Sequence, residues 1–197
     1  MSSAAFTSPL PLVQKAIWVE SKESSTNVTL RHDVPVPLPG DYDVLVKVEF
    51  SGLCHSDVYN ITGAHPMDVK IAGHEGVGHV VQVGSSVPES GAFSRRVGQR
   101  VGVKWIHETC GDCAVCERDE TLCDAQHNSG RDRPGTLQQY VVVPAKHASP
   151  IPDGVESKIA APLLCAGLTM YSAIAKTNSQ KNDWVVIQGA GGGLGHM

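Results

Sequence analysis

Residues 44–50 read VLVKVEF and alternate between two sets of side chains. One set is Val44, Val46, Val48 and Phe50, and the other is Leu45, Lys47 and Glu49. Alternation with a period of two is typical of a strand that is buried on one face. The stretch therefore predicts a half-buried β-strand.

Three later stretches of the chain also predict strands: residues 76–84, 101–105 and 137–143. Glycine and proline residues punctuate the chain between them, as in PVPLPG at 35–40. Several short strands with turns between them favour an irregular, barrel-like β domain. We assign this domain to residues 1–160.

The character of the chain changes after Pro150. Residues 155–176 are rich in Ala and Leu at helical spacing, and Pro162 is predicted to begin a second helix, because proline is tolerated in a first turn. Residues 183–188, DWVVIQ, predict a short apolar strand that leads into the glycine-rich turn GAGGGLG. A strand followed by such a turn is typical of the start of a dinucleotide-binding βαβ unit.

Length and composition limit the function classes. A chain of 197 residues allows one large domain, or one domain and part of another. The formal net charge of −4 argues against non-specific binding to nucleic acid, which needs a basic face. No continuous apolar run reaches the roughly 20 residues of a membrane-spanning helix. The first 19 residues lack a basic start and contain Pro9 and Pro11, so we expect no secretory signal and a cytoplasmic protein.

Four of the six cysteines fall close together, in the pattern Cys110-x2-Cys113-x2-Cys116-x6-Cys123. Structural zinc takes four ligands at tetrahedral corners, and short loops between thiolates supply them. The spacing therefore predicts a closed structural zinc site. The alternatives are a disulfide cluster or a redox Cys-x2-Cys pair, and each leaves two thiols without a role.

Cys54 and Cys165 are the remaining cysteines, and His74 lies in the short turn GHEG before a predicted strand. Two cysteines and one histidine make a three-ligand zinc site with an open fourth position, which is what catalysis needs. The alternative for His74, taken alone, is a buried structural histidine with a satisfied hydrogen bond.

Seven stretches in order resemble the zinc-dependent medium-chain alcohol dehydrogenase family and cover nearly the whole chain after residue 13. They are GLCHSDVYNITG (52–63), GHEGVGHVVQVG (73–84), GQRVGVKW (98–105), CGDCAVC (110–116), GTLQQYVVVPA (135–145), APLLCAGLTMYSAI (161–174) and VVIQGAGGGLG (185–195). The resemblance implies a mainly β, GroES-like catalytic domain followed at 161–197 by a linking helix and the truncated start of an α/β Rossmann domain.

The resemblance also implies roles for individual residues. The catalytic zinc would be held by Cys54, His74 and Cys165, and the structural zinc by Cys110, Cys113, Cys116 and Cys123. Glu75 would lie beside the catalytic metal, Asp57 would orient His74, and Ser56 would contact the alcohol hydroxyl and begin a proton relay. The residues that would serve NAD are His55 at the pyrophosphate, Thr169 at the nicotinamide, and the turn residues Ala190, Gly192 and Gly195.

Each role has a plainer alternative. Ser56 and Asp57 would also suit the cap of a helix that begins after Cys54. Thr169 would also suit an ordinary helix position, and Trp105, which would line the alcohol pocket by resemblance, would also suit a core.

The chain departs from the family pattern at several places. Tyr59 stands where many members end the relay with a histidine, and His65 stands where many have a pocket tryptophan. A phenol is a poorer acid–base group at neutral pH, so the relay is expected to end in solvent. The segment between Pro66 and His74 is about three residues short, which would displace His74, and Cys123 comes one residue early.

The resemblance implies an NAD-dependent oxidation of primary alcohols to aldehydes, or the reverse, by a full-length enzyme that is a homo-oligomer. After Gly195 the sequence has only two residues, so we expect a fragment or truncated chain that is inactive alone. The partner would be a small alcohol or aldehyde, without nucleic acid or membrane. The competing hypothesis is a non-catalytic, zinc-binding GroES-like module.

Overall fold

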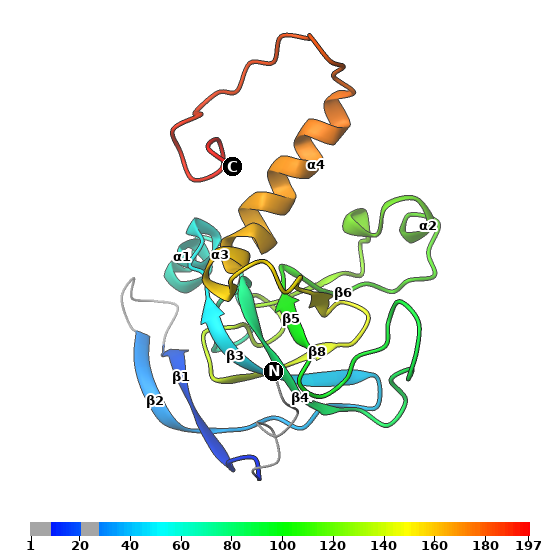
Figure 1. The fold of residues 1–197 in the computed structure, drawn as a ribbon. Coiled ribbons are helices and arrows are strands. Elements are labelled where there is room, and N and C mark those ends of the chain that lie inside the picture. Colours follow the sequence, from blue (N-terminus) through cyan, green and yellow to red (C-terminus); the bar gives the residue numbers. More distant parts are fainter. Residues whose placement is uncertain (1–8, 21–27) are drawn as a thin grey trace.

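The computed structural model describes residues 9–20 and 28–197 (Figure 1). Part of the segment predicted to contain no secretory signal, residues 1–8, lies outside the described residues. The strands are β1 (Val13–Val19), β2 (Val28–Pro35), β3 (Asp43–Ser51), β4 (Gly76–Val83), β5 (Arg100–Val103), β6 (Ile106–Glu108), β7 (His127–Asn128), β8 (Tyr140–Pro144) and β9 (Ser149–Pro150). The helices are α1 (His55–Thr62), α2 (Cys116–Asp119), α3 (Ser157–Pro162) and α4 (Leu168–Thr177), with a 3-10 turn η2 (Glu120–Leu122) and a π-helical turn η3 (Leu163–Gly167).

The central element is a five-stranded antiparallel sheet in the order β8-β3-β4-β5-β9. The pairs β1-β2 and β6-β7 form two smaller sheets beside it. The mainly β domain and the strands predicted at β3, β4 and β5 are confirmed, while β8 begins three residues after the start of the stretch predicted at 137–143. Figure 1 shows the sheets gathered in one body, from which α4 projects.

The strand β3 departs from its predicted alternation. Leu45 is fully buried beside Val44 and Val46, whereas Phe50 is 44% exposed. Two irregularities in the pairing with β4, at Leu45/Val46 and at Val48/Phe50, account for the change. A bulge adds a residue to one strand and re-aims the side chains that follow it. The main core is made by Val44, Val46, Val80, Val101, Val103, Val141, Val143, Ala145 and Ala148.

The helix predicted at residues 155–176 is confirmed as α3, η3 and α4, but the prediction that Pro162 begins a second helix is wrong. Pro162 ends α3, and the chain continues without a break into the π-helical turn. Proline has no N–H to donate to the preceding turn, and a wider turn accommodates the resulting gap in the hydrogen-bond ladder. Leu164 in this turn is buried and belongs to a second core cluster with Val77 and the alanines of α3.

The continuous helical segment Ser157–Thr177 is 21 residues long and apolar enough to cross a membrane by length and composition. The expectation that the chain contains no segment long and apolar enough to cross a membrane is therefore not met. One helix of this kind is weak evidence for a span, because core helices of soluble proteins pass the same test. Lys158 and Lys176 lie within the segment, and its N-terminal part packs on the sheet.

The strand predicted at residues 183–188 is wrong. These residues form no strand, and Trp184 and Val186 are 99% and 94% exposed. A strand needs a neighbour to pair its backbone groups, and no described strand lies beside this segment. Beyond α4 the chain turns back on itself in the glycine-rich stretch (Figure 1), where the Gly192 N–H donates to the Gly189 carbonyl at 2.9 Å.

Two histidines are buried, His107 within β6 and His147 after β8. His107 is 6% exposed and His147 is 2% exposed. Burial lowers the pKa of His107 to about 4, and the positive charge of Arg133 adds to the effect. Burial likewise lowers the pKa of His147 to about 4, with a further contribution from Lys104. Both imidazoles are therefore neutral in the folded chain at neutral pH.

The buried histidines predict a loss of stability in mild acid. The unfolded chain binds more protons than the folded chain between pH 6.5 and about 4, so the free energy of unfolding falls as the pH drops through this range. We expect His107→Asn to lose about 1–2 kcal/mol less than the wild type between pH 7.5 and pH 5 in urea titrations. The exposed-site variant His32→Asn is the control and should follow the wild type. Equal losses in all three proteins would contradict the assignment.

Candidate metal centres

A buried carboxylate joins two segments that lie far apart in the sequence. Asp57 is fully buried in the first turn of α1, and its Oδ2 accepts the backbone N–H of Cys54 at 3.0 Å. Its Oδ1 accepts the Gly73 N–H at 3.1 Å and lies 2.9 Å from His74 Nδ1. A carboxylate only accepts, so His74 Nδ1–H donates and Nε2 is left with its lone pair. The plainer alternative, a helix cap, is confirmed for Asp57, and the same side chain also holds His74.

Four potential ligands converge beside this carboxylate. The ligand atoms of Cys54, His74, Glu75 and Cys165 all lie within 4.8 Å of one another. The two sulfurs are 3.9 Å apart, close to the roughly 3.8 Å edge of a tetrahedron with zinc–sulfur bonds of about 2.3 Å. The short segment before His74 does not displace it, contrary to expectation. Soft thiols with one imidazole are a donor set that suits zinc, so the residues fit the ion.

The four ligands come from three segments of the chain. Cys54 is the N-cap of α1, His74 and Glu75 lie just before β4, and Cys165 lies in the π-helical turn η3. Leu164, the neighbour of Cys165, anchors the turn η3 on the sheet. Its side chain lies so close to Gly102 of β5 that a Cβ at Gly102 would collide with it. The packing of Leu164 on the sheet therefore helps to position Cys165.

Glycines bring the His74 turn into place, and the sequence reasoning did not single them out. Gly73 has a positive φ of 100°, a conformation that favours glycine. A Cβ at Gly130 or Gly135 would collide with the backbone of Gly73, and one at Gly52 would collide with the Glu75 carboxylate. Gly52, Gly73 and Gly135 each begin a matched stretch, whereas Gly130 lies in none of them and has no signal in the sequence.

Metal binding at this site is coupled to the loss of protons. Burial raises the pKa of the Cys165 thiol to about 12, and the neighbouring Cys54 adds to the shift. Burial also raises the pKa of Glu75, while His74 opposes this effect. A divalent ion would displace these protons, since metal binding and ligand deprotonation are coupled.

The other predicted catalytic and cofactor residues are distributed unevenly. Ser56 Oγ lies 3.7 Å from the Cys54 sulfur, within reach of the cluster. His55 is exposed and stacks edge-on against Tyr59, with ring centroids 4.6 Å apart. Thr169 is exposed on α4, one turn after Cys165.

The predicted cofactor residues of the glycine-rich turn lie apart from this group. Ala190, Gly192 and Gly195 are all in the C-terminal stretch, where Ala190 and Gly192 are exposed. Among the described residues, this stretch joins no sheet and adjoins no helix N-terminus. It therefore does not form a dinucleotide cradle in this structure.

A hollow borders Trp105, which also contacts His74. Trp105 stands edge-on to the His74 ring, with centroids 5.1 Å apart, and also borders an open hollow of about 310 Å³. The other residues at this hollow are His65, Pro66 and Arg131. Trp105 and His65 are the positions expected to shape a pocket, whereas no local pattern in the sequence marks Arg131.

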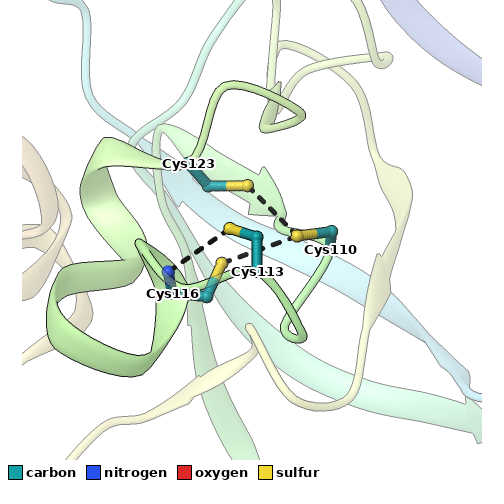
Figure 2. Close-up of side chains that lie close together, drawn as sticks. All are labelled: Cys110, Cys113, Cys116 and Cys123. Atoms are coloured by element: carbon teal, nitrogen blue, oxygen red, sulfur yellow. Dashed lines mark hydrogen bonds between the residues drawn. The ribbon is translucent and has the colours of Figure 1, made fainter.

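The second cluster is shown in Figure 2. The four sulfurs converge from one loop, with Cys110 Sγ 3.7 Å from Cys116 Sγ and 3.5 Å from Cys123 Sγ. The Cys116 N–H points at Cys113 Sγ and lowers the pKa of that thiol to about 7. All four ligand atoms lie within 4.8 Å of one another, so the early position of Cys123 is accommodated. The six cysteines are free thiols, which does not support the disulfide alternative.

Comparisons with known proteins point to one family. A family model described as "Alcohol dehydrogenase GroES-like domain" matches residues 40–153. Alcohol dehydrogenase 2 of Emericella nidulans is 43% identical over 195 residues, which are 95% of this chain and 52% of the relative. An alcohol dehydrogenase of Schizosaccharomyces pombe is 42% identical over 84% of this chain and 47% of the relative. The chain thus spans about half the length of the curated relatives it matches.

Solved structures agree. A thermostable alcohol dehydrogenase from Pyrobaculum aerophilum with bound cobalt and zinc has a TM-score of 0.83 at 26% identity, over 93% of this chain and 54% of that one. An acetophenone reductase from Geotrichum candidum in complex with NAD has a TM-score of 0.75 at 33% identity, over 89% of this chain and 50% of that one.

The Asp57 contacts predict a test of metal affinity. We expect Asp57→Asn to weaken zinc binding at the Cys54–His74–Cys165 site by about 10- to 100-fold, because the variant no longer offers a charged acceptor to His74. Competition with a chromophoric chelator measures the change. The four-cysteine site serves as the internal reference, and the exposed-site variant Asp41→Asn serves as the control. Unchanged affinity in Asp57→Asn would refute the orienting role.

Proposed function

This chain belongs to the zinc-dependent medium-chain alcohol dehydrogenase family through its GroES-like domain, and we propose that it carries the metal and alcohol half of that activity. The reaction is the oxidation of a primary alcohol to an aldehyde, or the reverse, with NAD as the hydride acceptor. The domain division at residue 160, the cytoplasmic location and the self-association of a longer enzyme remain predictions.

One observation carries the proposal: the convergence of Cys54, His74, Glu75 and Cys165 within 4.8 Å. These ligands come from segments as much as 111 residues apart, and one of them is held by a buried carboxylate. A site assembled by the whole fold, with two cysteines and one histidine as ligands and a carboxylate that can give way, leaves a fourth position for a substrate.

The protein's own residues divide the work around that ion. A bound zinc would supply Lewis acidity that lowers the pKa of an alcohol hydroxyl. Cys54, His74 and Cys165 would hold the ion, with Glu75 as the nearby carboxylate that can approach or replace a ligand. Asp57 keeps the proton of His74 on Nδ1, so that Nε2 faces the cluster. Trp105 forms a wall between His74 and the hollow.

A proton leaving the alcohol would pass to Ser56 Oγ, which is the hydroxyl beside the cluster. The next aromatic groups along α1 are His55 and Tyr59, stacked on each other. Tyr59 is 43% exposed, so a proton delivered there reaches solvent. This agrees with a relay that ends in water at this position.

The proposal of NAD as the cofactor rests on other grounds than the proposal of the metal site. NAD is proposed from the family and from the NAD complex of the acetophenone reductase. His55 and Thr169 lie near the metal cluster by sequence, next to Cys54 and four residues after Cys165. The residues Ala190, Gly192 and Gly195 form no cradle among the described elements, so no step is derived through the dinucleotide.

That exposed glycine-rich stretch favours the second candidate, a zinc-binding module without catalysis. The two candidates differ in how many metal ions the chain holds and in whether the Cys54 site meets an alcohol.

Metal analysis discriminates between the candidates. We expect two zinc ions per chain in the purified wild type. The variants Cys165→Ser and Cys113→Ser should each hold one zinc ion per chain, because each substitution removes a ligand from a different cluster. The measurement is inductively coupled plasma mass spectrometry on zinc-saturated, desalted protein. One zinc in the wild type that is unaffected by Cys165→Ser would favour the non-catalytic module.

Turnover provides a further test. We expect the 197-residue chain alone to reduce NAD with ethanol no faster than a metal-free sample, because its described residues form no dinucleotide cradle. NADH absorbance in the presence of saturating zinc, ethanol and NAD measures the rate. Turnover at an ordinary enzyme rate would contradict this expectation.

A further inference from the structure

The helix α1 turns two polar side chains toward the protein interior. Asp57 and Asn60 are 0% and 1% exposed, whereas Val58 and Tyr59 on the same helix are 39% and 43% exposed. Positions three apart lie on one face of a helix, so the two buried polar side chains share a face. A surface helix usually buries apolar side chains on its inner face. Burial of apolar surface alone therefore does not explain the inner face of α1.

The Asn60 amide bonds to a loop that lies 70 residues further along the chain. Its Nδ2–H donates to the Gly130 carbonyl at 3.3 Å. A backbone carbonyl only accepts, so the amide nitrogen must face Gly130 and Oδ1 must point elsewhere. This Oδ1 is buried and has no hydrogen-bond partner among the described residues. A leucine of similar size would avoid the cost of a buried, unpaired acceptor, so packing alone does not account for an asparagine at this position.

Gly130 in turn lies against the residue that precedes His74. A Cβ at Gly130 would stand 2.7 Å from the Gly73 nitrogen and 2.8 Å from its carbonyl oxygen, so the two backbones are in direct contact. The same loop continues to Thr136, whose N–H donates to the Gly73 carbonyl at 3.0 Å. Because closely packed groups transmit strain, a displacement of Gly130 would be felt at the His74 turn.

Three segments thus form a closed cycle of contacts around this turn. Asp57 joins α1 to the turn, because it accepts the Gly73 N–H at 3.1 Å and lies 2.9 Å from His74 Nδ1. The contacts of Gly73 with Gly130 and Thr136 join the turn to the loop. The Asn60 bond joins the loop back to α1. It therefore fixes the spacing between the two segments that hold the turn.

We propose that Asn60 is a positioning residue of the metal centre. Its amide holds the Gly130 loop against the His74 turn, which keeps His74 on Asp57 and directs Nε2 toward Cys54 and Cys165. The inference rests on the proposed function in so far as this cluster holds zinc, and it adds a residue that acts through the backbone of a neighbouring loop. Its loss should weaken metal retention at one cluster rather than the fold as a whole.

The test uses the full chain and two substitutions at one position. Asn60→Leu keeps the size of the side chain and removes the donor, and Asn60→Ala tests the same bond without added bulk should the leucine prevent folding. The control is Val143→Ala, because Val143 belongs to the main core and its truncation destabilises the fold without removing a polar contact of α1. A cooperative urea transition and retained zinc at the four-cysteine site show that each variant is folded.

Two rates are measured. The first is the release of zinc to a chromophoric chelator, in which the phase of each cluster is assigned with Cys165→Ser and Cys113→Ser. The second is the hydrogen exchange of the Gly73 amide in the metal-free chain, followed by NMR. This amide donates to Asp57, so its exchange reports on the His74 turn without any metal.

We expect Asn60→Leu to speed zinc release from the Cys54–His74–Cys165 cluster about tenfold relative to release from the four-cysteine cluster, because a metal ligand loses part of its orientation. The Gly73 amide should also exchange faster. Val143→Ala should leave the ratio of the two release rates unchanged, although it lowers the free energy of unfolding. An equal change of this ratio in Val143→Ala would show a merely structural role and overturn the inference.

Failure of the inference is distinguishable from failure of the proposed function. If the wild type releases two zinc ions but the Asn60 variants leave the ratio of the rates unchanged, the inference is overturned and the proposed function stands. If the wild type shows a single phase that Cys165→Ser does not alter, the proposed function is overturned. The Gly73 amide then decides on Asn60, because unchanged exchange in its variants would overturn the positioning role as well.

Discussion

One buried carboxylate determines how the Cys54–His74–Cys165 cluster is assembled. The Asp57 carboxylate is fully buried and accepts hydrogen bonds from the Cys54 N–H, the Gly73 N–H and the His74 ring, each 3.1 Å or shorter. A charge in such a place costs several kcal/mol unless its acceptors are satisfied. The start of α1 and the turn before β4 therefore cannot move independently. The glycines at 130 and 135 follow from this constraint, because the turn must come close to a second loop.

Much of the fold follows from local sequence signals, and the failures have a common cause. The alternation at 44–50 and the spacing of Cys110 to Cys123 are local, and they correctly predict a strand and a four-cysteine cluster. The residues 183–188 have the composition of a strand but no neighbour to pair with, so composition alone misleads. Pro162 has the signal of a helix start, yet packing of Leu164 on the sheet carries the helix through it.

The candidate site was predictable in its ligands and not in its surroundings. Cys54, His74 and Cys165 were identified because their residue types and the family resemblance mark them. Arg131 and the packing of Gly130 on Gly73 depend on contacts between segments more than 50 residues apart, which no local pattern records. The pocket is therefore where the structure adds most to the sequence.

The two metal clusters differ greatly in how much chain they enclose. Cys110 and Cys123 are 13 residues apart, whereas Cys54 and Cys165 are 111 apart. Closing the longer loop costs about 2 kcal/mol more in chain entropy, and it also requires the intervening sheet. During synthesis the four-cysteine loop leaves the ribosome complete while Cys165 has still to be translated. A nascent chain can thus take up its first zinc well before the site for the second exists, and the order of the ligands along the gene becomes an order of metal loading in time.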